Sequence, residues 1–96
     1  MGRTESVIFK NDTCFLCGLP YTETHHIFHG TANRKISDRY GYVVRLCPKH
    51  HTGDAGVHFN RELDLFFMKK AQEHFEKNHG SRQDFIKVFG KSFMEE

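Results

Sequence analysis

Two pairs of metal-ligand residues constrain the fold of this chain more than any other feature. Cys14 and Cys17 are separated by two residues. Cys47 and His50 repeat that spacing further along the sequence. Two intervening residues allow both side chains of a pair to reach one ion from a tight turn, and three cysteines with one histidine form a normal ligand set for structural zinc. We therefore expect these four residues to hold one zinc ion.

The alternative for the first pair is a redox Cys-x-x-Cys motif, with Cys47 as a buried apolar residue. A thioredoxin-like motif occurs in a βαβ context, which the sequence lacks. The odd count of 3 cysteines argues against a disulfide framework, and the first residues lead into no apolar signal segment. Metal binding in a reducing cytoplasm is the expectation.

Length restricts the organisation of the chain. With 96 residues, we expect one domain over residues 1–96, and a structural metal is a natural supplement to so small a core. The net charge of +2 neither demands nor excludes a polyanionic partner. No apolar run approaches membrane-spanning length, so no membrane partner is expected.

The residue pattern predicts a small α+β domain. Short strands are expected over Val7–Lys10, Thr24–Phe28 and Tyr42–Leu46, with a polar loop from Gly30 to Gly41. The metal-ligand residues place a zinc and catalytic core at about residues 14–64.

Helices are expected over about residues 60–92. Asn60 is a candidate N-cap for the main helix, and Ser81 is one for a shorter helix after Gly80. Apolar residues recur at helical spacing, and five phenylalanines are expected in the core: Phe66, Phe67, Phe75, Phe85 and Phe89.

The core region holds more imidazoles than one zinc ion can use. Besides His50, it contains His25, His26, His29, His51 and His58. Adjacent side chains on a strand point to opposite faces, so His25 and His26 are expected to act as one metal ligand and one base. A second, open metal site could then be held by His25, His51 and His58. His29 is not expected to be a ligand, since a turn role is equally compatible with its position.

The segments Cys14-Phe15-Leu16-Cys17, His25-His26-Ile27-Phe28 and Leu46-Cys47-Pro48-Lys49-His50-His51 resemble the HNH endonuclease family. The resemblance implies a ββα-metal, treble-clef-like fold. It also implies that His25 and His51 bind a catalytic metal and that His26 is the general base. The chain looks closest to small phage-type members, including those similar to phage recombination-enhancement nucleases.

The chain departs from the family pattern at three points. His50 stands where the family usually has a second cysteine, a replacement that zinc tolerates. The family's middle asparagine has no counterpart just before Cys47, and the closest asparagine, Asn33, lies further upstream. His58 follows His51 by seven residues, so the intervening loop must fold back for His58 to serve as a ligand.

The expected reaction is hydrolysis of a DNA phosphodiester, with His26 taking a proton from water and a divalent metal (Mg, Mn, Ni or Zn) stabilising the phosphoanion. Five basic residues flank the metal motifs and are expected to contact DNA: Arg34, Lys35, Arg39, Arg45 and Lys49.

Two other classes of function compete with the nuclease. One is a non-catalytic treble-clef module that binds DNA or a protein partner, and the other is a purely structural zinc domain. Neither explains the surplus of histidines. A nuclease of this size would cut both strands of a duplex as a homodimer or within a larger recombination or phage complex.

Overall fold

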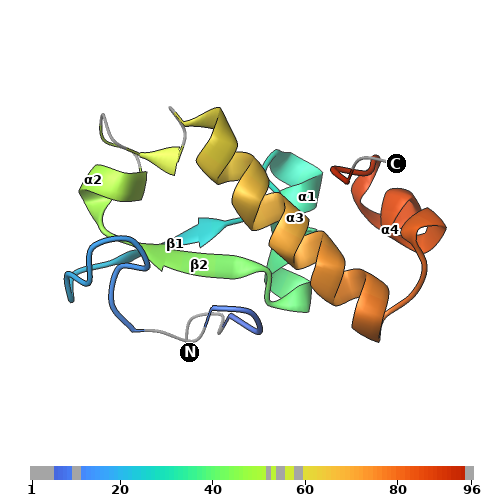
Figure 1. Ribbon diagram of the computed structural model, residues 1–96, viewed down its shortest axis with the longest axis horizontal. Coiled ribbons are helices and arrows are strands. Elements are labelled where there is room, and N and C mark those ends of the chain that lie inside the picture. The colour runs from blue at the N-terminus through green and yellow to red at the C-terminus, as the bar shows by residue number, and fades with distance from the viewer. Residues whose placement is uncertain (1–5, 10–11, 52, 54–55, 58–59, 95–96) are drawn as a thin grey trace.

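A computed structural model describes residues 6–9, 12–51, 53, 56–57 and 60–94. The described residues form a small α+β domain with one two-stranded sheet (Figure 1). The elements, in order, are β1 (Glu23–His26), α1 (Thr31–Tyr40), β2 (Val43–Leu46), α2 (Pro48–His51), α3 (Arg61–Asn78) and α4 (Arg82–Phe89). Within the described part of the chain, no helix is both long and apolar enough to cross a bilayer.

The sheet places the two neighbouring histidines on opposite faces. β1 and β2 are antiparallel, with His25 opposite Val44 and His26 opposite Val43. His25 is only 2% exposed, and its ring lies 6.2 Å from that of Phe67 on α3, which crosses this face of the sheet. His26 is half-buried on the other face. The predicted alternation is therefore confirmed.

The core is aromatic and joins the sheet to the C-terminal helices. Its largest buried side chains include Phe28, Tyr42, Phe67 and Phe85. The phenol oxygen of Tyr42 lies within hydrogen-bonding distance of Nδ1 of His74, at 3.1 Å, and burial raises the pKa of Tyr42.

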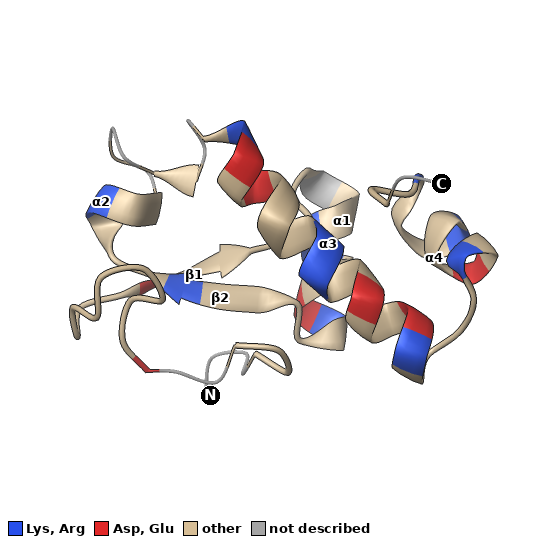
Figure 2. Ribbon diagram, in the orientation of Figure 1, with Lys and Arg blue, Asp and Glu red and all other residues tan. Residues whose placement is uncertain are grey.

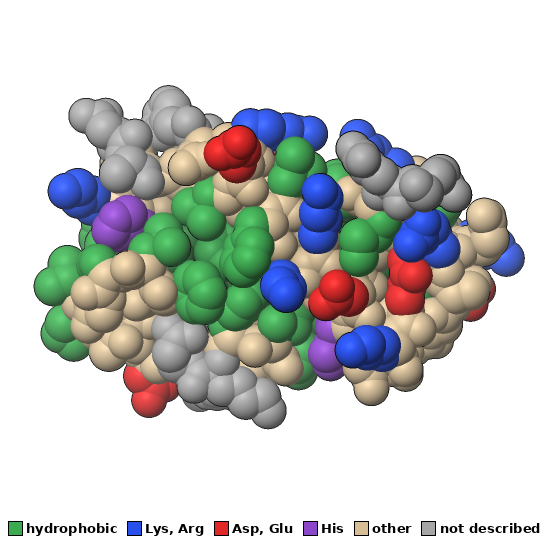
Figure 3. All heavy atoms as spheres, in the orientation of Figure 1, with side chains coloured by type: hydrophobic (Ala, Val, Ile, Leu, Met, Phe, Trp, Pro, Cys, Tyr) green, Lys and Arg blue, Asp and Glu red, His purple; other side chains and the backbone are tan. Residues whose placement is uncertain are grey.

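The predicted core position is wrong for one of the five phenylalanines. Phe66 is 40% exposed, whereas the other four are buried. It stacks loosely beside Phe15, with 6.4 Å between the ring centroids. Figure 3 shows hydrophobic side chains gathered on this surface, over the first half of α3 and the adjoining loop.

The predicted helix caps are confirmed. The side chain of Asn60 accepts a hydrogen bond from the backbone N–H of Leu63 at 3.1 Å. Ser81 and Asp84 form a reciprocal capping box at the start of α4. These bonds satisfy amide groups that have no partner inside the helix, which explains why both helices begin where they do.

The predicted loop from Gly30 to Gly41 is wrong, because most of it is helix α1. The helix is bounded by glycine at both ends, and Gly41 closes it in a left-handed conformation at φ 77°. Ser37 anchors the helix to the segment after β1. Its buried hydroxyl accepts from the backbone N–H of Phe28 at 3.0 Å and donates to the carbonyl of Phe28 at 2.9 Å.

The predicted strand over Val7–Lys10 is also wrong for its described residues, and Lys10 lies outside them. The hydroxyl of Ser6 accepts hydrogen bonds from the backbone N–H groups of Ile8 and Phe9, at 3.2 and 2.8 Å. This local capture of amides competes with pairing in a sheet.

Candidate metal centre and histidine pocket

The four residues of the paired motifs converge in space. One ligand atom from each of Cys14, Cys17, Cys47 and His50 lies within 4.8 Å of all the others. This convergence was predicted, and the set can hold a metal ion such as zinc. The alternative of a separate redox pair with Cys47 as a mere core residue does not account for the position of His50.

The spacing of these atoms suits a tetrahedral ion. Bonds of about 2.3 Å to sulfur and about 2.05 Å to nitrogen separate tetrahedral ligand atoms by about 3.6–3.8 Å. The sulfurs of Cys17 and Cys47 are 3.6 Å apart, and the sulfur of Cys14 lies 3.7 Å from Nδ1 of His50. The sulfur of Cys47 is slightly closer to that nitrogen, at 3.3 Å. The donor atoms thus stand near the separations that zinc requires.

A tight turn presents the first pair of cysteines. The backbone N–H of Gly18 donates to the carbonyl of Cys14 at 2.9 Å. Gly18 follows the second cysteine and adopts φ 80°, a left-handed conformation that glycine takes without steric cost. The N–H of Phe15 donates to the carbonyl of Arg45 at 2.9 Å. That bond ties the turn to β2, two residues before the second ligand pair begins at Cys47.

The short helix α2 presents the second pair. Pro48 occupies its first position, and the carbonyl of Cys47 accepts from the N–H groups of His50 and His51 at 3.0 and 2.9 Å. A Cβ on Gly53 would lie 2.8 Å from the carbonyl oxygen of Lys49. Glycine is therefore required there for the chain to turn back after one helical turn.

Backbone hydrogen bonds lower the pKa of one thiol of the cluster and so favour the thiolate, the form that binds metal. Burial raises the pKa of the Cys14 thiol, but backbone N–H groups of Cys47, Cys17 and Leu16 outweigh that effect and bring the pKa from 9.0 to about 6. For Cys17, the backbone N–H of Leu19 lowers the pKa, while desolvation and the neighbouring thiols together raise it above its ordinary value. With a pKa below neutrality, Cys14 is a thiolate at neutral pH.

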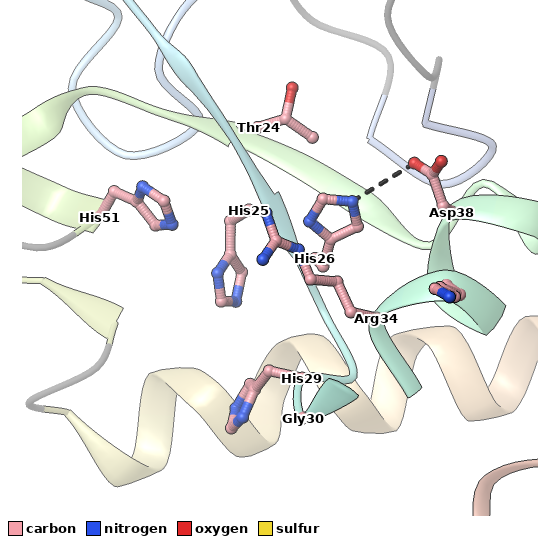
Figure 4. A pocket seen from close by; sticks show the side chains of 9 residues that line it. Thr24, His25, His26, His29, Gly30, Arg34, Asp38 and His51 are labelled. Carbon is pink, nitrogen blue, oxygen red and sulfur yellow. Dashed lines mark hydrogen bonds and ion pairs between the residues drawn. The ribbon is translucent and has the colours of Figure 1, made fainter. Parts of the chain in front are cut away.

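A separate pocket of 810 Å³ opens beside β1, and most of the histidine surplus reaches it (Figure 4). It is lined by Thr24, His25, His26, His29, Gly30, Arg34, Lys35, Asp38 and His51. The ring of His25 lies 5.4 Å from that of His51 and 6.3 Å from that of His29, measured between centroids. The structure thus brings together two of the three predicted ligands of the second metal, next to the predicted base. The third, His58, lies outside the described residues.

Three pocket histidines each have a carboxylate neighbour on a different element. Nδ1 of His51 lies 2.7 Å from Glu23, and Nε2 of His26 lies 3.3 Å from Asp38. A carboxylate beside one ring nitrogen fixes the orientation of an imidazole and directs its other nitrogen elsewhere.

The third pair includes a residue that sequence reasoning set aside. Nε2 of His29 lies 3.4 Å from Asp64, a buried carboxylate near the start of α3. Asp64 lies 35 residues from His29 along the chain, so no local spacing links the two. The only signal in the sequence was the position of His29 just after the strand that carries His25 and His26.

The five predicted substrate-binding residues separate into two groups. Arg34 and Lys35, on α1, line the pocket. Arg39 and Lys49 are exposed outside its lining, and Arg45 is only 8% exposed on β2. Figure 2 shows the basic positions on β2 and α2 at one end of the molecule, where the metal-ligand turn and α2 meet.

The missing asparagine of the family pattern is not supplied by Asn33. Its side-chain amide donates to the carbonyl of Phe89 at 3.3 Å and so joins α1 to α4. The bracing of the segment after β1 is instead done by Ser37, through both of its bonds to Phe28. Sequence reasoning missed Ser37 because it assigned α1 as loop.

No protein-family model, no curated protein and no solved structure matches the chain. Within the described residues, the Cys14, Cys17, Cys47 and His50 set is the one group of three or more candidate ligands whose donor atoms gather this closely.

Proposed function

We propose that this protein is a metal-dependent HNH-type endonuclease that hydrolyses DNA phosphodiester bonds. The observation that carries the proposal is the convergence of His25, His26 and His51 on one pocket that also receives Arg34 and Lys35. A binding module needs basic side chains but has no use for three imidazoles placed among them.

The proposed fold is of the ββα-metal type, stabilised by zinc. β1, β2 and α2 are the two strands and the helix of that unit, and α1 is an additional helix between the strands. The paired cysteine turn, joined to β2 through the Phe15–Arg45 backbone bond, supports this assignment. Zinc at the cysteine cluster is proposed to be structural because all four of its positions are taken by side chains.

The second, catalytic metal is proposed to bind between His25 and His51, with His58 as the third ligand. When bound, a divalent ion supplies positive charge that stabilises the pentacovalent phosphate and the departing oxygen. The buried position of His25 holds one ligand rigidly. His51 is held by Glu23 through Nδ1, which leaves Nε2 as its donor to a metal.

His26 is the proposed general base. With Nε2 beside Asp38, its Nδ1 is the nitrogen that can accept a proton. As the oxygen of a water molecule bonds to phosphorus, one proton of that water passes to Nδ1. The bond from phosphorus to the leaving oxygen breaks, and that oxygen is protonated by solvent.

Arg34 and Lys35 are proposed to hold the DNA backbone. Both lie on the first turns of α1 and line the pocket beside the histidines. Their charges attract phosphate, and the two guanidinium N–H groups of an arginine match two phosphate oxygens. DNA bound in this way presents one phosphodiester to His26.

A plasmid-nicking assay tests the proposal. Purified protein containing zinc would be incubated with supercoiled DNA and Mg²⁺, Mn²⁺, Ni²⁺ or additional Zn²⁺. We expect nicking with at least one ion and a loss of about 10²-fold or more in His26→Ala. His79→Ala, at an exposed histidine after α3, is the matched control and should keep its activity. Folded, zinc-containing protein that nicks with none of the ions would instead favour the non-catalytic module.

A further inference from the structure

Among the described residues, Asp38 is the one acidic residue that lines the histidine pocket. It lies on α1, and its side chain is 51% exposed at the pocket rim. Its Oδ1 stands 3.3 Å from Nε2 of His26, as the dashed line in Figure 4 marks. The carboxylate thus reaches the proposed base from a different element of the fold.

The backbone of Asp38 is held at a fixed place relative to β1. Its neighbour Ser37 is fully buried and bonds to both backbone groups of Phe28, two residues after β1 ends. The carbonyl of Asp38 accepts from the N–H of Gly41 at 3.2 Å, in the turn that closes α1. Asp38 is therefore placed by buried contacts, although its carboxylate is at the surface.

The chemistry of the contact determines the state of the imidazole. An ionised carboxylate only accepts hydrogen bonds, so the ring nitrogen beside Asp38 must carry a proton. In a neutral ring the other nitrogen, Nδ1, then holds the lone pair. Arg34 and Lys35 lie one turn earlier on the same helix and line the same pocket.

We infer that Asp38 is a positioning residue for His26. It holds the Nε2–H tautomer, directs Nδ1 to the attacking water, and stabilises the imidazolium that forms when Nδ1 takes the proton. This inference rests on the proposed role of His26 as base. It assigns to Asp38 no contact with DNA or metal.

The test compares Asp38→Ala, Asp38→Asn and Asp38→Glu with the parent. Glu62→Gln, which removes an exposed carboxylate from the start of α3, is the matched control. For each variant, kcat and KM for nicking, zinc content and melting temperature are measured. Proton NMR records the downfield imidazole N–H signal of His26, assigned by its absence in His26→Ala.

We expect kcat to fall about 10- to 100-fold in Asp38→Ala, with KM changed less than about twofold. The N–H signal should disappear from the Asp38→Ala spectrum because the proton then exchanges with water. Asp38→Asn should also be impaired, since a neutral amide stabilises the imidazolium less well. Asp38→Glu should recover part of kcat, and Glu62→Gln should match the parent.

Three outcomes would overturn the inference. Asp38→Ala with parental kcat, or with an unchanged N–H signal, removes the positioning role while leaving His26 as base. A loss of activity accompanied by lost zinc or by a lower melting temperature assigns Asp38 a purely structural role. A parent protein that does not nick, or a fully active His26→Ala, overturns the proposed function and the role of Asp38 with it.

Discussion

Oε1 of Glu23 lies 2.7 Å from Nδ1 of His51, and this contact joins the start of β1 to the end of α2. Side chains separated by 28 residues meet there. The contact occupies the ring nitrogen nearer the backbone, so that only Nε2 of His51 is left for the pocket. Glu23 would therefore orient a ligand of the proposed second metal without binding that metal itself.

Glu23→Ala should weaken binding of the second metal about 10- to 100-fold, the usual effect of removing a carboxylate that orients a metal-binding histidine. Calorimetric titration of zinc-loaded protein with Mn²⁺ or Ni²⁺ would measure this. Glu73→Ala, at an exposed position on α3, is the control and should bind normally. Equal affinity in both variants would contradict the orienting role.

Removal of metal from the cysteine cluster should destabilise the fold. The ligands come from the turn at Cys14 and from the start of α2, and a bound ion would join all four of them. We expect a chelator to lower the melting temperature by about 10 °C or more, since about 1 kcal/mol corresponds to about 4–8 °C for a domain of this size. Scanning calorimetry measures the shift. In Cys47→Ser the chelator should have almost no further effect.

The lowered pKa of Cys14 predicts how the metal-free protein responds to pH. Its pKa is about 6 in the fold, against an ordinary 9.0, so the unfolded chain binds more protons between these values. The free energy of unfolding should therefore rise with pH across this window. The contribution is complete above pH 9 and is lost as the pH falls through about 6. Urea titrations of chelated protein under reducing conditions measure the slope, and Cys14→Ser should have a smaller one.

Arg34→Ala should weaken DNA binding and reduce the slope of log affinity against log salt concentration by about 1, as expected for one lost phosphate contact. Arg34 lines the pocket, whereas Lys77 is exposed near the far end of α3. Lys77→Ala is thus the control that removes one positive charge away from the pocket. Fluorescence anisotropy at several salt concentrations measures the slope for both variants. Identical slopes for the two variants would place DNA elsewhere.

Ser81→Ala should lower the free energy of unfolding by about 1 kcal/mol, because the hydroxyl of Ser81 accepts from the N–H of Asp84 at the start of α4. The carboxylate of Asp84 also accepts from the N–H and from the hydroxyl of Ser81, and these two bonds lower the pKa of that carboxyl. Urea denaturation measures the loss. Ser81→Thr keeps the cap and should lose much less stability.

Features encoded by local spacing were predictable from the sequence. The two ligand pairs of the cysteine cluster, the opposite faces of His25 and His26, and the caps at Asn60 and Ser81 each depend on residues close together in the chain. That the two distant pairs meet was predictable because one zinc ion needs four ligands. Helix α1 was missed because glycines at both of its ends resemble loop residues, and because no side chain caps its first turn. The stabilising contact of α1, between Ser37 and Phe28, is tertiary.

The carboxylate partners of the histidines could not be predicted from local spacing in the sequence either. Asp38 lies 12 residues from His26, and Glu23 and Asp64 are further still from their histidines. Each pairing depends on how two elements pack. The sequence therefore identified three imidazoles of the pocket, those of His25, His26 and His51, but neither His29 nor the carboxylates beside the rings.

Helix α2 has only four residues, too few to be stable by itself in water. His50 joins it to the cysteine cluster, and the next residue, His51, faces the pocket. An empty cysteine cluster would remove the metal bond that anchors α2 and would thereby loosen the position of His51. On the proposed mechanism, a newly made chain becomes able to cut DNA only after it has bound zinc. The supply of zinc would therefore determine when each newly synthesised molecule becomes active.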